Sequence, residues 1–120
     1  MDTDGVIRVV VGAAYEVSNA LGAGFREKVY HQALLQELTE RGLKTRSEVR
    51  YPVSYKGRRV GVYVADLIVE DCVLVELKCV DPFGSEHMAQ CLNYLKASAL
   101  HLALLINFQK SRVEWKRIIL

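Results

Sequence analysis

Three charged residues lie within the two apolar arms of a stretch that runs from Val64 to Lys78 and turns at Glu70-Asp71, and their types could support metal-dependent chemistry. Asp66 lies in the first half of this stretch, and Glu76 and Lys78 lie in the second half. A charged side chain inside a β-branched, apolar strand is costly unless it is paired or bound to a metal. We therefore interpret these three residues as candidates for a functional site.

The register of the hairpin that contains these residues decides whether their side chains meet. A two-residue turn would place Asp66 and Glu76 on opposite faces of the sheet, because successive side chains alternate. A three-residue turn over residues 70–72 instead gathers Asp66, Glu76 and Lys78 on one face. It leaves three apolar pairs on the other face: Val69 with Val73, Leu67 with Val75, and Ala65 with Leu77. We predict this second register.

The predicted register brings two carboxylates together. Directly opposed Cβ atoms are about 5 Å apart, so Asp66 and Glu76 would repel each other unless one is protonated or a cation lies between them. Carboxylate oxygens and a backbone carbonyl suit Mg²⁺ or Mn²⁺. We predict such an ion, held by both carboxylates and the Leu77 carbonyl oxygen. Lys78 would orient a metal-bound water or offset transition-state charge, which favours phosphodiester hydrolysis.

Length and composition limit the class of protein. The 120 residues suffice for one domain, which we place at residues 1–120. The chain is 51% apolar and 25% charged, values typical of soluble globular domains. No apolar run approaches the ~20 residues of a membrane-spanning helix, and the acidic start MDTDG does not resemble a secretory signal. We expect a cytoplasmic protein with no membrane partner and three reduced, structural cysteines.

Hydrophobic periodicity predicts the element order ααβββαββ. Apolar residues at helical spacing indicate a first helix with Asp4 as its cap, which Gly22-Ala23-Gly24 ends. A second helix follows over residues 25–41, with Gly42 as the C-terminal glycine. A third helix is expected with Ser85 as its N-terminal cap. Strands are expected at residues 48–55, 60–69, 73–80, 102–108 and 113–120, the last as an edge strand. The pattern predicts an α/β fold with a mixed sheet flanked by helices.

The charged residues also form a known motif. Ala65-Asp66 and Glu76-Leu77-Lys78 resemble the PD and ExK elements of the PD-(D/E)xK nuclease superfamily, although the proline is absent. The segment from Gly24 to Tyr30, GFREKVY, matches the GxxExxY signature, so almost the whole chain resembles that family. The resemblance implies a restriction-endonuclease-like fold and a nuclease activity.

Further site residues follow from the resemblance. Glu27 is implied as an additional acid that contributes to metal binding, although an acid in the first turn of a helix is also favourable through the helix dipole alone. Gln90 and Tyr94 lie four residues apart and resemble the QxxxY element of RecB-type members. They are implied to position the substrate or Lys78. The histidines, which lack a second His or Cys at metal spacing, are interpreted as surface or hydrogen-bonded residues.

Three functions compete at this point. The leading hypothesis is a Mg²⁺-dependent or Mn²⁺-dependent nuclease, with DNA favoured over RNA as the partner. The alternative is an inactive nuclease-fold module that binds nucleic acid or a protein. The third is a structural protein in which Lys78 forms an ion pair with one carboxylate. A homodimer is expected by analogy with enzymes that cut both strands of a duplex. The basic residues around Gly57 have two interpretations: they contact a phosphate backbone, or they are solvated turn residues with no binding role.

Overall fold

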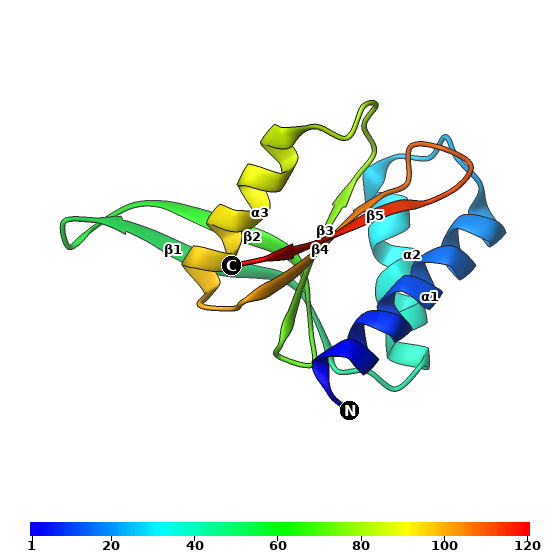
Figure 1. Ribbon diagram of the computed structural model, residues 1–120, viewed down its shortest axis with the longest axis horizontal. Helices are drawn as coiled ribbons and strands as arrows, with labels where there is room; N and C mark the ends of the chain where they lie inside the picture. The colour runs from blue at the N-terminus through cyan, green and yellow to red at the C-terminus, as the bar shows by residue number, and fades with distance from the viewer.

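Three helices and five strands make up the chain, in the predicted order. The computed structural model describes all 120 residues. The elements are α1 (Thr3–Leu21), α2 (Glu27–Glu40), β1 (Thr45–Tyr55), β2 (Arg58–Val69), β3 (Val73–Lys78), α3 (Ser85–Ser98), β4 (Leu102–Asn107) and β5 (Glu114–Ile119). Figure 1 shows α1 and α2 on one side of the sheet and α3 on the other.

The five strands form a single mixed sheet in the order β1-β2-β3-β4-β5. Only β3 and β4 are parallel, and α3 is the crossover that connects them. The other neighbouring pairs are antiparallel. The predicted α/β architecture is confirmed, and β5 is an edge strand as expected.

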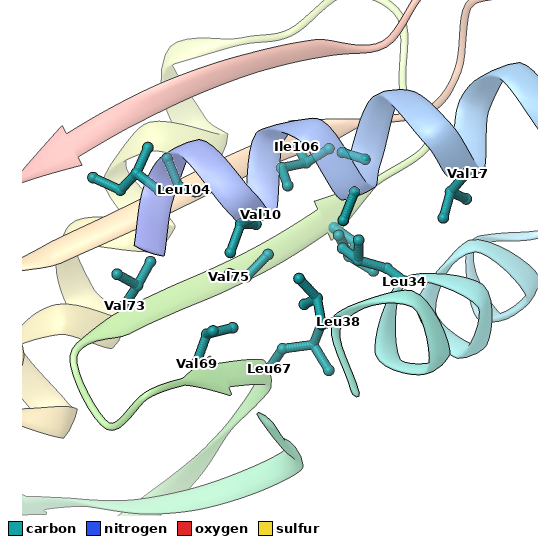
Figure 2. Close-up of a cluster of buried hydrophobic side chains, with 14 of the residues drawn as sticks. Val10, Val17, Leu34, Leu38, Leu67, Val69, Val73, Val75, Leu104 and Ile106 are labelled. Carbon is teal, nitrogen blue, oxygen red and sulfur yellow. The ribbon is translucent and has the colours of Figure 1, made fainter. Parts of the chain in front are cut away.

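Two apolar clusters cover the two faces of this sheet. The larger contains 19 buried residues and joins α1 and α2 to β2, β3 and β4. Figure 2 shows Val10 of α1 and Leu34 and Leu38 of α2 against Leu67 and Val75 of the sheet. The smaller cluster lies under α3 and includes Cys91 and Leu95. Burial on both faces explains why β3 is almost continuously apolar.

The pairing of β2 changes along its length. Its C-terminal end pairs with β3 over Leu67–Val69, while the whole strand pairs with β1. The rest of the β1–β2 hairpin therefore projects from the body of the protein, as Figure 1 shows. The point at which β2 leaves β3, between Asp66 and Leu67, is called the fork below.

Several predicted boundaries were wrong, and side-chain hydrogen bonds to the backbone account for two of them. The cap of α1 is Asp2, not Asp4, since the Gly5 N–H donates to Asp2 Oδ1 at 2.8 Å. Strand β3 ends at Lys78 rather than Val80, where the Asn107 side chain bonds both backbone groups of Val80. Helix α2 begins at Glu27, and β1 begins at Thr45.

The start of α3 also differs from the prediction. Its cap is Gly84 rather than Ser85, and the Gly84 N–H donates to His87 Nδ1 at 3.0 Å. His87 therefore accepts a capping hydrogen bond at the N-terminus of α3. By contrast, Gly42 follows the last residues of α2 with a φ of +83°, which agrees with the predicted glycine. The three cysteines are free, and no helix is long and apolar enough to cross a membrane.

Candidate functional site

The β2–β3 hairpin has the register that the sequence predicts. Leu67 pairs with Val75, and Val69 pairs with Val73, so residues 70–72 form a three-residue turn. Glu70 and Asp71 in this turn adopt left-handed backbone conformations, with φ of 52° and 55°. The next positions along the two strands are Asp66 and Glu76, at the fork.

Side chains replace the strand ladder at the fork. The Asp66 N–H donates to Glu76 Oε1 at 3.0 Å, and the Leu77 N–H donates to Asp66 Oδ2 at 2.8 Å. Each carboxyl group thus satisfies a backbone donor of the opposite strand, which would otherwise lack a partner where the strands diverge. The two acids are held together by this reciprocal pair of hydrogen bonds.

The charge at the fork is unbalanced. Glu76 is only 3% exposed, and burial, followed by the negative charge of Asp66, raises its pKa to about 9. The positive charge of Lys78 lowers this pKa by a smaller amount. Glu76 is therefore protonated at neutral pH unless a cation offsets the repulsion. No ion pair joins Lys78 to either carboxylate, so the hypothesis of a Lys78 ion pair is wrong.

One part of the predicted face assignment was wrong. Ala65 was expected beside Leu77, but it belongs to the smaller cluster with Ile68 and Cys91, whereas Leu77 belongs to the larger one. Alternation within β2 should place Ala65 on the face of Leu67, but the strand is irregular at Asp66 between them. Asp66 has no partner on β1, and Glu48, which lies opposite it, adopts a left-handed backbone conformation with a φ of 53°.

Helix α2 contributes two polar residues to this region. Glu27, in its first turn, has a raised pKa, first because of partial burial and then because of the negative charge of Asp66. Lys78 and His31 lower this pKa by smaller amounts. Glu27 is therefore within electrostatic reach of Asp66 and Lys78.

His31 is a neighbour of the fork that the sequence analysis did not select. Its side chain is buried, with Nδ1 4.0 Å from Asp66 Oδ1 and Nε2 2.8 Å from Ser47 Oγ. The interpretation as a hydrogen-bonded histidine is correct, but the residue also borders the site. The available signal was its position four residues after Glu27, one turn along the same helix face.

Helix α3 brings Tyr94 to the opposite side of the fork. Burial, followed by the negative charges of Glu76 and Asp66, raises the Tyr94 pKa to about 12. Cys91 lies beneath the same acids, and its pKa is also raised to about 12, mainly by burial. Gln90 is exposed and makes no hydrogen bond within the protein. The structure thus brings Tyr94, but not Gln90, into the electrostatic surroundings of the carboxylates.

The fork has suitable donors for a hard cation but not a finished coordination shell. No group of three or more His, Cys, Asp or Glu side chains is arranged to hold a metal. Asp66 Oδ1 and Glu76 Oε2 are nevertheless not used by the two backbone hydrogen bonds. Two carboxylate oxygens and a nearby backbone carbonyl are ligands that Mg²⁺ and Mn²⁺ accept, with water completing the shell. The donor chemistry therefore fits such an ion.

Comparisons with known proteins concern the family and the fold of the chain. A family model described as the PD-(D/E)XK nuclease superfamily matches residues 4–118. No curated protein matches the chain. Among solved structures, the crystal structure of SSO0001 is similar, with a TM-score of 0.59 and 19% sequence identity over 78% of this chain and 50% of that chain. At this identity the likeness concerns the fold alone, and the chain spans about half the length of SSO0001.

Proposed function

Because the chain belongs to the PD-(D/E)XK nuclease superfamily, we propose that it is a metal-dependent nuclease that hydrolyses phosphodiester bonds in nucleic acid. The observation that carries the proposal is the apposition of Asp66 and Glu76 at the fork, held by reciprocal hydrogen bonds to the backbone. When two carboxyl groups lie next to each other in a largely buried site, a bound cation offsets the repulsion between their ionised forms.

The residues at the fork would take separate roles. Asp66, Glu76 and the Leu77 carbonyl oxygen would hold Mg²⁺ or Mn²⁺, with Glu27 contributing from α2. The bound ion would supply Lewis-acid stabilisation of the phosphoryl oxygens and a more acidic water. Lys78, half-buried at the end of β3, would orient the attacking water and offset the negative charge that develops on the phosphate.

Other residues would act on the substrate. Tyr94 lies close enough to Glu76 for the two groups to influence each other electrostatically, and its hydroxyl would position Lys78 or the phosphate. Gln90, exposed one turn earlier on α3, would contact the substrate. We also assign the chain to the GxxExxY family with a RecB-like QxxxY element, and we favour DNA over RNA and a homodimer over a monomer.

A cleavage assay tests this function. The wild type should cut DNA in Mg²⁺ or Mn²⁺ and not in chelator, and Asp66→Asn and Lys78→Met should each reduce the initial rate about 100-fold or more. Matched controls come from the exposed turn of the β2–β3 hairpin, where Asp71 Oδ2 lies 2.9 Å from Nζ of Lys44, the residue before β1. Asp71→Asn and Lys44→Met should retain the wild-type rate. Equal rates in all four variants would show that a contaminant is responsible.

One observation favours a second function, a module that binds nucleic acid without cutting it. Both acids at the fork are engaged with backbone N–H groups, and no three-residue metal group is present. Such a module should bind nucleic acid in chelator with a steep salt dependence. It should yield no product at any metal concentration, whereas the nuclease should turn over substrate once the metal is added.

A further inference from the structure

A cleft lies beside the fork, between the projecting β1–β2 hairpin and α3. Its volume is about 530 Å³, within the range of sites that hold small molecules. Figure 1 shows α3 beside the projecting hairpin. Seven residues line the cleft: Pro52, Val53, Ser54 and Tyr63 from the hairpin, and Asn93, Lys96 and Ala97 from α3.

The cleft is joined to the candidate site by a pair of aromatic rings. The ring of Tyr63 packs edge to face against Tyr94, with 4.4 Å between the ring centroids and an interplanar angle of 76°. Tyr94 in turn lies in the field of Glu76 and Asp66. A molecule in the cleft would therefore be separated from the carboxylates by this pair of tyrosine rings.

The lining of the cleft has the chemistry that recognises a nucleotide. Tyr63 offers a ring on which a base can stack, and Asn93 offers an amide that can bond a base edge. Lys96 is exposed and carries the positive charge that a phosphate needs, and no acidic residue lines the cleft. Exposed basic residues also occupy the hairpin tip, at Lys56, Arg58 and Arg59. The charge of this region is therefore complementary to a nucleic-acid backbone.

The dimensions indicate which form of nucleic acid fits. A cleft of this volume admits about one nucleotide and is too small for a paired double helix. A base can reach Tyr63 only if it is unpaired, because paired bases are stacked inside the duplex.

We propose that this cleft is a subsite for one unpaired nucleotide next to the phosphate that is cut. Tyr63 stacks on the base, Asn93 bonds its edge, and Lys96 contacts the adjoining phosphate. The substrate class is therefore a single-stranded segment, whether a free strand, an overhang or a frayed end. The choice of nucleic acid as the ligand rests on the proposed nuclease function.

Binding without metal tests the cleft separately from catalysis. Fluorescein-labelled oligothymidylate, oligouridylate and a blunt DNA duplex are titrated with the full chain in chelator, and anisotropy gives each Kd. The wild type should bind the DNA or RNA single strand more tightly than the duplex, and the two single strands identify the preferred sugar. Tyr63→Leu should weaken single-strand binding about tenfold. Lys96→Met should reduce the slope of log affinity against log salt by about 0.7.

Controls separate these effects from misfolding and general charge loss. Tyr55→Leu removes a more exposed tyrosine near the tip of the same hairpin, and Lys116→Met removes an exposed lysine on the distant strand β5. Both controls should bind single strands as the wild type does. An oligonucleotide containing 2-aminopurine should lose fluorescence when it binds the wild type, because the base stacks, and should lose less with Tyr63→Leu. Thermal melts check that each variant is folded.

The two proposals fail in different ways. The cleft is refuted if the wild type does not prefer single strands, or if folded Tyr63→Leu and Lys96→Met bind as the wild type does. That result would leave metal-dependent cleavage and its loss in Asp66→Asn unaffected. Conversely, weakened binding in the cleft variants, together with no cleavage by the wild type, would support the cleft and refute the nuclease.

Discussion

Two regions of the β2–β3 hairpin lie next to each other but are built in opposite ways. At Leu67 and Val75 the strands are paired, and their side chains enter the apolar cluster beneath α1 and α2. At Asp66 and Glu76 the strand pairing gives way to bonds from carboxylates to backbone N–H groups. The comparison indicates that the apolar cluster provides stability, while the fork uses the same two strands to place charged groups.

The polar fork adjoins paired strands on the side of the apolar cluster. The pair Leu67–Val75 and the parallel ladder from β3 to β4 fix both strands up to the acids. A functional group is most effective when secondary structure holds it in place. The fork therefore combines a fixed geometry with an electrostatic conflict between Asp66 and Glu76 that a bound cation would relieve.

The largest effect is expected in the apolar cluster. Leu38 on α2 is fully buried there, so Leu38→Ala should lower the free energy of unfolding by about 2–5 kcal/mol. Chemical denaturation measures this change. The cleavage rate of the remaining folded molecules, measured at low temperature, should stay within about twofold of the wild type. A large loss of activity in fully folded protein would show that the apolar cluster determines activity as well as stability, which contradicts the distinction between the two regions.

The next effect concerns Glu76 and pH. Its pKa is 4.5 when unperturbed and about 9 in the folded protein, so the folded state binds more protons between these values. Stability should therefore fall as pH rises through this range, by about 1 kcal/mol per pH unit in metal-free protein. Glu76→Gln resembles the protonated acid and should remove this contribution, and it should also abolish metal-dependent cleavage. Urea titrations at several pH values measure the slopes, and equal slopes in both proteins would contradict the assignment.

A smaller effect is expected for Glu27, which lies at the border of the fork. If it assists metal binding from α2, Glu27→Gln should lower the cleavage rate about tenfold at limiting Mg²⁺ and less at saturating Mg²⁺, a difference of about 1.4 kcal/mol. Glu40→Gln, which changes an exposed acid at the C-terminal end of α2, serves as the control. If the rate does not depend on residue 27 at any metal concentration, Glu27 does not assist metal binding and only stabilises the first turn of α2 through the helix dipole.

The smallest effect is expected for Gln90. Because this side chain is exposed and makes no hydrogen bond within the protein, Gln90→Ala should change the free energy of unfolding by less than about 0.5 kcal/mol. If Gln90 contacts substrate, KM should rise while kcat changes little. Steady-state cleavage of a short oligonucleotide separates these constants. An unchanged KM would show that Gln90 does not contact the substrate.

The sequence predicted the architecture and the hairpin register because both depend on apolar alternation. Only one register buries Leu67, Val69, Val73 and Val75 together, and that requirement also brings Asp66 to Glu76. Their pairing could therefore be derived without the structure. The element order followed in the same way from helical and strand periodicity.

Features that depend on a local backbone irregularity or on tertiary packing could not be derived in this way. Ala65 and Leu67 belong to different clusters because β2 is irregular at Asp66, opposite Glu48, whose left-handed backbone the apolar pattern does not reveal. His31 approaches Asp66 because α2 packs across the sheet, a contact between residues 35 positions apart in the chain. The caps at Asp2 and Gly84 depend on single side-chain hydrogen bonds, which vary over one or two positions.

The most direct test of the metal site is a crystal structure of the protein soaked in Mn²⁺, with data collected near the manganese absorption edge. We predict an anomalous density peak between Asp66 and Glu76, within coordination distance of both carboxylates and the Leu77 carbonyl oxygen, and no such peak in Asp66→Asn. A well-ordered fork at saturating Mn²⁺ in which both carboxyl groups keep their backbone hydrogen bonds, with no anomalous peak, would contradict the account.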